Sequence, residues 1–230
     1  MDDQIDASAP VDGLPLVHLV RQPLTEPASG ARPPLLALAH GLNSNERDLF
    51  SLADTLALRC VVVSVRAPLE NAPGAYAWFG IQYSTHGTQV DAEQLDASRK
   101  RYADFLGAAV MAYGADPDQV YTLGFSQGAI ISLVTALSHP RRFAGVVALS
   151  GRIPQEAEQW LASPNETAGL PVFMAHGTHD MTIAIAQARA ARDLLERQRV
   201  DLTYREYPMG HGVSPEVYAD LSAWLAQRLG

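Results

Sequence analysis

The sequence predicts an α/β fold with a mostly parallel central sheet and helices on both of its faces. Continuously apolar stretches at 35–39, 61–65 and 145–149 alternate with longer stretches of helical spacing. Strands that are apolar throughout are typical of a parallel sheet buried on both sides, and their alternation with helices is typical of the α/β class. A chain of 230 residues can form one large core, so we expect a flexible tail at 1–13 and a single domain at 14–230.

In the first half of the chain, the expected elements are strands at 14–20, 35–39 and 61–65 and helices at 46–58 and 91–113. Apolar residues at the i, i+3, i+4, i+7 spacing from Leu49 predict the first helix. Gly114 is the expected stop of the second. The stretch at 66–88 is aromatic and rich in Gly and Pro, which predicts a long functional loop.

In the second half, the expected elements are strands at 119–124, 145–149, 172–175 and 202–207 and helices at 129–137, 185–197 and from 214 onward. The strand at 202–207 is more polar than the others, which favours a position near an edge. Ser214-Pro215 predicts the cap and first residue of the last helix. Only about twenty residues lie between the strands at 145–149 and 172–175. This length predicts that no large cap domain covers the site.

Gly124-Phe125-Ser126-Gln127-Gly128 fits the G-x-S-x-G pattern. A β-rich run precedes it and an apolar helical run follows it, which is the context of a nucleophile elbow. The tight turn between strand and helix holds the serine hydroxyl where a substrate carbonyl can reach it, and glycines flank it because there is little room for Cβ atoms. Ser126 is therefore the predicted nucleophile.

A serine hydroxyl needs a base to take its proton and an acid to orient that base. Ligands of parallel sheets bind at the carboxyl ends of the strands, and in this type of fold the acid and then the histidine follow the serine. Of the seven histidines, only His211 follows the serine, comes after an acid candidate, lies in a Gly-rich turn and precedes a final helix. Asp180 follows the strand at 172–175, whereas its rival Asp201 precedes a strand. The sequence thus predicts the set Ser126, Asp180 and His211.

The tetrahedral intermediate of acyl transfer needs hydrogen-bond donors aimed at its oxyanion. Gln127, which follows the nucleophile, supplies one backbone N–H. The second donor is expected from the loop after the strand at 35–39, where Leu42 N–H is the predicted group and Gly41 provides room. Asn43 could add a side-chain donor, but its interpretation as a turn residue is favoured.

The chain resembles α/β-hydrolases of the carboxylesterase, phospholipase and acyl-protein thioesterase family. The matching segments are LALAHGLNSNERDL, RAPLENAPGAYAWFGI, GFSQGAIISL, HGTHD and YPMGHGVSPE. The resemblance implies hydrolysis of carboxylic esters or thioesters without a metal or organic cofactor. It also implies Ser126, Asp180 and His211 as the triad and Leu42 and Gln127 as the oxyanion donors. The loop at 75–82 resembles bacterial esterases more than eukaryotic thioesterases.

An apolar pocket that accepts small to medium apolar esters is expected beside the serine. Its expected lining is Trp78, Phe79, Ile81, Met181 and Ile183. The alternative for the two large aromatic residues is that they anchor the loop to the body of the protein.

The net charge of −8 excludes nucleic acid and a stable association with anionic membranes as the main interactions, because both need a basic surface. The single cysteine, Cys60, excludes an internal disulfide and is expected to be buried and inert. The N-terminus lacks a signal-peptide pattern, so a cytoplasmic location is expected. The partner is expected to be a small-molecule ester, and the oligomeric state is left open between a monomer and a homodimer.

Two other classes of function compete with a serine hydrolase. The first is a non-catalytic or slow ligand-binding protein on the same fold, because fold alone does not determine function. The second is a metal hydrolase that uses His176, His179 and Asp180. The two histidines lie on a loop after a strand rather than on one helix face, and no further ligand group is evident in the sequence, so no metal site is predicted.

Overall fold

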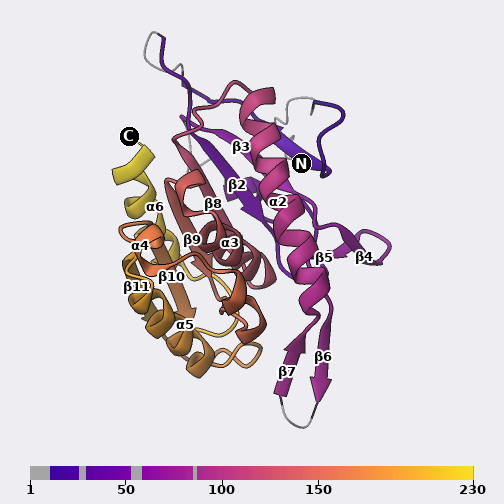
Figure 1. The fold of residues 1–230 in the computed structure, drawn as a ribbon, viewed down its shortest axis with the longest axis vertical. Helices are drawn as coiled ribbons and strands as arrows, with labels where there is room; N and C mark the ends of the chain where they lie inside the picture. Colours follow the sequence, from indigo (N-terminus) through magenta and orange to yellow (C-terminus); the bar gives the residue numbers. More distant parts are fainter. Residues whose placement is uncertain (1–10, 26–29, 53–58, 85–86, 230) are drawn as a thin grey trace.

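A computed structural model describes residues 11–25, 30–52, 59–84 and 87–229, and its centre is a seven-stranded sheet (Figure 1). The strand order is β1-β3-β2-β8-β9-β10-β11. The strands are β1 His18–Arg21, β2 Leu35–Ala39, β3 Val61–Val65, β8 Val120–Phe125, β9 Gly145–Leu149, β10 Pro171–Gly177 and β11 Asp201–Tyr207. Only β1 is antiparallel to its neighbour. The mostly parallel sheet is confirmed, and the polar strand β11 lies at its edge.

Alternate residues of the central strands pack on opposite faces of the sheet. In β2, Leu35, Ala37 and Ala39 join one buried cluster, whereas Leu36 and Leu38 join the other. The helices divide accordingly (Figure 1): α2 Ala92–Ala112, α3 Gln127–Ser138 and α5 Ile185–Arg197 cover the first face, and α6 Pro215–Leu229 covers the second. The sheet is therefore buried on both sides, as its continuously apolar strands predict.

The helix expected at 46–58 is absent from the part of that stretch that the structure describes, apart from the 3₁₀ turn η1 Phe50–Leu52. Side-chain bonding explains the difference. The Asn45 side chain accepts a hydrogen bond from the Arg47 amide at 3.0 Å, and a bond of this kind to a neighbouring backbone amide competes with a helix. The buried Glu46 carboxylate binds the side chain of Arg66 at 2.6 and 2.7 Å, which ties the segment to the end of β3. Residues 53–58 lie outside the described residues.

The loop expected at 66–88 contains two β-hairpins that project from the body of the protein (Figure 1). They are β4 Leu69–Ala72 with β5 Ala75–Ala77, and β6 Ile81–Ser84 with β7 Gly87–Val90. Gly74 turns the first hairpin at a φ of 75°, a conformation that favours glycine. The sequence did not predict these hairpins, because their strands are too short to show a clear period.

The first strand begins at His18 rather than at 14, and of the tail expected at 1–13 only 11–13 are described. Between β9 and β10 the chain forms only the short helices η3 Gln155–Trp160 and α4 Pro164–Thr167, which leaves no large cap.

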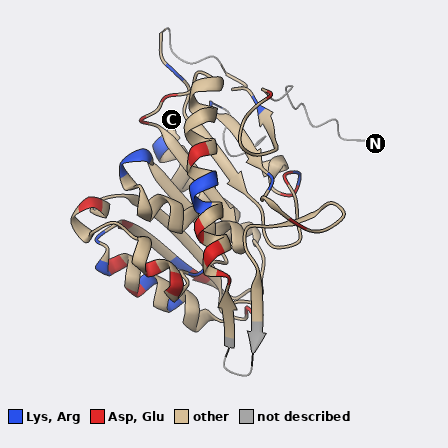
Figure 2. Ribbon diagram, turned by 45° about the vertical axis from the view of Figure 1, so that its right-hand side comes forward, with Lys and Arg blue, Asp and Glu red and all other residues tan. Residues whose placement is uncertain are grey.

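Charged residues of both signs are mixed along α2, α5 and α6, whereas α3 carries none (Figure 2). None of the helices in the described ranges has the length and apolar character needed to cross a lipid bilayer. Cys60 is fully buried, and this burial raises the pKa of its thiol to about 12. The thiol is therefore kept protonated and unreactive.

Candidate active site

Ser126 lies in a tight turn between β8 and α3 and has a φ of 54°. The turn requires glycine on both sides. A Cβ at Gly124 would lie 2.0 Å from the Gly128 carbonyl oxygen, and a Cβ at Gly128 would lie 1.9 Å from that of Ala39. A left-handed backbone at a non-glycine residue costs about 1–3 kcal/mol, and such strain is found at sites where it has a function. The turn has the geometry of a nucleophile elbow.

The structure brings together the three residues that the sequence predicts as a triad. His211 Nε2 lies 2.9 Å from Ser126 Oγ, and His211 Nδ1 lies 2.7 Å from Asp180 Oδ2. With the hydrogen on Nδ1, the imidazole donates to the carboxylate and Nε2 accepts the serine proton. Ser126 and Asp180 are 9% and 5% exposed, so both hydrogen bonds are partly shielded from solvent, which strengthens them.

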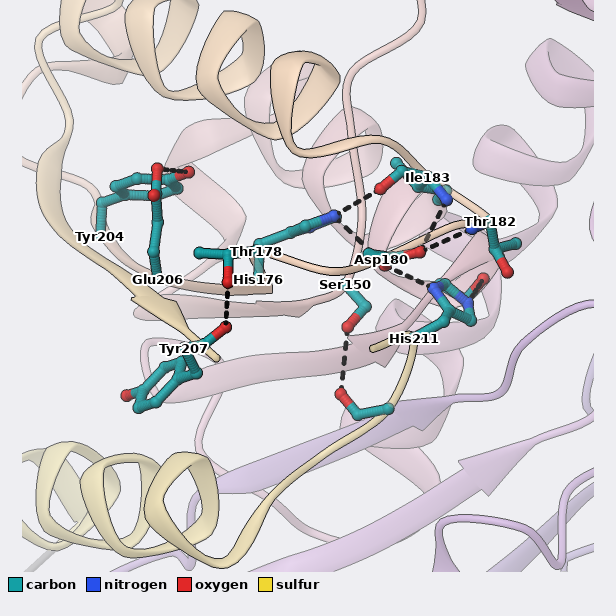
Figure 3. Close-up of polar contacts among 12 residues, drawn as sticks. Ser150, His176, Thr178, Asp180, Thr182, Ile183, Tyr204, Glu206, Tyr207 and His211 are labelled. Atoms are coloured by element: carbon teal, nitrogen blue, oxygen red, sulfur yellow. Dashed lines mark hydrogen bonds and ion pairs between the residues drawn. The ribbon is translucent and has the colours of Figure 1, made fainter. Parts of the chain in front are cut away.

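The carboxylate of Asp180 is held as an anion by several donors (Figure 3). The amides of Thr182 and Ile183 donate to Oδ1 at 2.8 and 2.9 Å. Burial acts to raise the pKa of Asp180, but the hydrogen bonds from His211 and from these two amides outweigh it, so the pKa is lowered from its ordinary value. An ionised acid beside Nδ1 is what a base of this type needs.

A second imidazole lies beside Asp180, and the sequence does not predict its role. The fully buried His176 donates from Nε2 to the Ile183 carbonyl at 2.8 Å and lies 3.3 Å from Asp180 Oδ2 (Figure 3). It therefore holds the segment that carries the two amide donors. His179 is exposed, so the two histidines do not face one site. Among the described residues there is no group of three or more His, Cys, Asp or Glu able to hold a metal ion.

Backbone contacts fix the loop that carries His211 against the loop that carries Asp180. The amides of Thr178 and His179 donate to the carbonyls of Tyr207 and Met209 at 2.8 and 3.0 Å. A Cβ at Gly177 would lie 2.3 Å from the Met209 carbonyl oxygen, so only glycine permits this approach. Ser150 Oγ also donates to the Gly212 carbonyl at 3.1 Å (Figure 3). The only sequence feature that could have indicated this role is the position of Ser150 directly after the buried strand β9.

The Gln127 side chain connects the elbow to the segment before the second hairpin. Its Oε1 accepts a hydrogen bond from the Trp78 amide at 2.7 Å, and its Nε2 donates to the Phe79 carbonyl at 2.6 Å. The side chain is buried, so water cannot replace either bond. Sequence reasoning considered only the backbone N–H of this residue.

We expect Gln127→Ala to lower the free energy of unfolding by at least about 2 kcal/mol, because it leaves two buried backbone groups without partners. The substitution keeps the backbone N–H, so any loss of activity reports on the position of Phe79 rather than on that donor. Urea unfolding and ester kinetics measure the two effects. Gln119→Ala is the matched control, because Gln119 lies at the amino end of β8 and away from the site. Equal stability of the two variants would contradict the role assigned to the Gln127 side chain.

Ser126 and His211 open into a cavity of about 280 Å³. Phe79, Ile81 and Ile183 line it, as the sequence predicts. Trp78 and Met181, which were expected there, lie elsewhere.

Trp78 is fully buried beneath the site, where its Nε1 donates to the His40 carbonyl at 3.0 Å, so it anchors the segment. Met181 is 95% exposed, because the turn that presents the Thr182 and Ile183 amides directs it to solvent.

Both predicted oxyanion donors, Leu42 and Gln127, also line the cavity. Gln127 is the first residue of α3, and the N–H groups of a helix's first turn have no carbonyl partner within the helix. The Gln127 N–H is therefore not used by the helix and can donate to an oxyanion. Asn43 has a φ of 59°, and its side chain accepts a hydrogen bond from Asn71, which is the behaviour of a turn residue. Polar residues that the sequence did not single out also line the cavity, Arg152 among them.

The sheet order, the elbow between β8 and α3 and the positions of Asp180 and His211 at the carboxyl ends of the strands define this chain as an α/β-hydrolase. The family model for phospholipase/carboxylesterase matches residues 22–229. The chain therefore belongs to that family.

Named relatives agree with this assignment. The chain is 28% identical over 223 residues to acyl-protein thioesterase 1 of Mycosarcoma maydis, covering 86% of this chain and 93% of that protein. It is 30% identical over 156 residues to a probable carboxylesterase of Arabidopsis thaliana, covering 66% and 59%. The match spans little more than half the length of that plant protein and of a second Arabidopsis thaliana carboxylesterase, 59% and 53%. A solved carboxylesterase of Bacillus cereus is 28% identical, covers 93% and 94%, and superposes with a TM-score of 0.78.

Proposed function

We propose that this protein is a serine hydrolase that cleaves small to medium carboxylic esters, and thioesters of similar size, through an acyl-enzyme. The observation that carries the proposal is the continuous set of hydrogen bonds from Ser126 through His211 to Asp180, at 2.9 and 2.7 Å. Family membership and relatives named carboxylesterase and acyl-protein thioesterase support it. A binding protein would not need a strained serine at the end of such a chain.

In the proposed mechanism, His211 Nε2 takes the proton of Ser126 while Oγ attacks the ester carbonyl. The backbone N–H groups of Leu42 and Gln127 stabilise the oxyanion. His211 then gives its proton to the leaving alcohol or thiolate, which breaks the bond to the carbonyl carbon. Water attacks the acyl-enzyme with the same proton transfers and releases the acid. Asp180 stays ionised throughout and stabilises the imidazolium.

We expect a fluorophosphonate probe to label the protein with a stoichiometry of one and to abolish its turnover of p-nitrophenyl esters and acyl-CoA thioesters. The reason is that Ser126 is the one hydroxyl predicted to be activated by a base. Intact-mass spectrometry measures the label, and peptide mapping locates it. Turnover that survives labelling, or that EDTA removes, would contradict the serine mechanism and favour a metal hydrolase.

A further inference from the structure

Arg152 is a cationic residue in the wall of the proposed active-site cavity. It follows β9, and the carbonyl of the last residue of that strand, Leu149, accepts a hydrogen bond from the Ser126 amide at 2.8 Å. A Cβ at the intervening Gly151 would lie 2.5 Å from Ala129 Cβ. The segment before Arg152 is therefore fixed against the elbow, and Arg152 lines the same cavity as Ser126.

Arg152 lacks a protein partner among the described residues. No hydrogen bond, ion pair or aromatic ring engages its guanidinium within the described ranges. Other arginines of this protein are paired, as in Arg66 with Glu46 and Arg189 with Glu206. Burial lowers the pKa of Arg152, against a weaker opposing effect of Glu156. Because a guanidinium stays protonated in proteins, this charge is partly withdrawn from water without compensation.

The other charged residue in the cavity wall, Asp48, does not neutralise Arg152. Asp48 is exposed to solvent. The carboxylate whose charge acts on Arg152 is that of Glu156. Exposed charges are screened by water and salt, so Asp48 leaves the cavity able to accept an anion.

We propose that Arg152 binds a carboxylate carried by the substrate, so that the preferred esters are short ones with an anionic group at one end. This proposal rests on the proposed function and specifies its substrate class. The planar guanidinium matches a carboxylate with two parallel hydrogen bonds. Phe125, Ile130 and Ile183 of the same wall supply apolar contacts for the methylene groups of the chain. A cavity of about 280 Å³ restricts the substrate to a short chain.

The test compares pairs of esters that differ only by a carboxylate in place of a terminal methyl group. Monoethyl adipate is measured against ethyl hexanoate to place the anion on the acyl side. The ester 3-butanoyloxypropanoate is measured against propyl butanoate to place it on the alcohol side. The readout is the ratio of kcat/KM for the anionic ester to that for its neutral partner.

We expect the wild-type ratio to exceed one in at least one pair and Arg152→Met to lower it by about 10- to 100-fold, the range for a hydrogen bond to a charged group. Arg152→Lys keeps the positive charge but loses the planar group that can form two parallel hydrogen bonds, so its ratio should lie between those of the wild type and of Arg152→Met. Arg197→Met is the control for net charge, because Arg197 is exposed on α5 and away from the cavity; it should keep the wild-type ratio. A ratio that Arg152→Met leaves unchanged in both pairs would overturn the proposal.

A binding measurement separates failure of this proposal from failure of the proposed function. Calorimetric binding of adipamate, the monoamide of adipate, and of hexanamide requires no turnover, and the two amides differ only by a carboxylate in place of a terminal methyl group. Preferred binding of adipamate that Arg152→Met removes supports the anion site even if neither ester is hydrolysed. Equal binding of both amides by the wild type, with normal turnover of ethyl hexanoate, overturns the anion site and leaves the hydrolase intact.

Discussion

We expect Ser126→Ala to lower kcat for ester hydrolysis by about 10⁶-fold, the cost of removing the nucleophile from a comparable triad. The substitution removes Oγ, which donates a hydrogen bond to His211 Nε2 at 2.9 Å, and leaves no other hydroxyl predicted to be activated at that position. Hydrolysis that persists should then reflect only the oxyanion donors and substrate binding. Steady-state kinetics on p-nitrophenyl esters, together with fluorophosphonate labelling, measures the loss.

The fold should survive the same substitution, since alanine keeps the Cβ and adopts the same backbone. Ser126→Gly is the informative companion variant. At a φ of 54° glycine avoids the steric cost that alanine bears, so the glycine variant should be the more stable of the two by about 1 kcal/mol. Thermal unfolding compares them. Activity within tenfold of wild type in either variant would assign the nucleophile to another residue.

We expect Asp180→Asn to lower kcat by about 10⁴-fold, the effect of the equivalent change in the serine-protease triad. The carboxamide can donate to His211 Nδ1, and this favours the tautomer with the hydrogen on Nε2. An imidazole in that tautomer cannot take the proton of Ser126. The lost rate is measured on the same ester substrates at a pH well above the ordinary pKa of an aspartate, where the wild-type carboxylate is charged.

Asp201→Asn is the matched control for that substitution. Asp201 begins β11 at the opposite end of the strands, and its carboxylate contacts only Arg228 among the described residues, at 3.4 Å. A substitution at such a surface position changes stability by less than about 0.5 kcal/mol, so activity should stay near that of the wild type. A loss below tenfold in Asp180→Asn combined with a large loss in Asp201→Asn would reverse the assignment of the acid.

The pH dependence of the free energy of unfolding gives an independent test of the ionisation of Asp180. The folded pKa of this carboxyl is lowered from its ordinary value of 3.8. Its contribution to folding is therefore fully present above the ordinary value and is lost as pH falls through the lowered one. The stability difference between wild type and Asp180→Asn should accordingly shrink under acid conditions.

The features that could be predicted from sequence are those that follow from continuous patterns. Apolar runs such as 61–65 predicted their strands, and the order of strands placed Ser126, Asp180 and His211 at one edge of the sheet, where the structure brings them together. The absence of a helix from the described part of 46–58 could not be predicted in the same way, because the side chains of Asn45 and Glu46 bind groups that a period of apolar residues does not reveal.

The directions of individual side chains could not be predicted from the sequence either. Trp78 and Met181 both lie beside residues that line the cavity, yet one is fully buried and the other is 95% exposed. The distinction depends on a turn whose amides bind Asp180 and on an indole that binds the His40 carbonyl. The unpaired charge of Arg152 was equally hidden, since the pairing of an arginine depends on residues distant in the chain.

The Gln127 side chain fixes residues 78 and 79 to the elbow, so the chain is held in place just before the hairpin of β6 and β7 begins. Beyond that attachment, the hairpin of β6 and β7 contributes Ile81 and Thr88 to the cavity wall. Insertions, deletions or exchanges in the hairpin would reshape substrate selectivity while the reactive serine keeps its geometry. Evolution, whether natural or directed, can therefore diversify the compounds that this scaffold accepts without first rebuilding its chemistry.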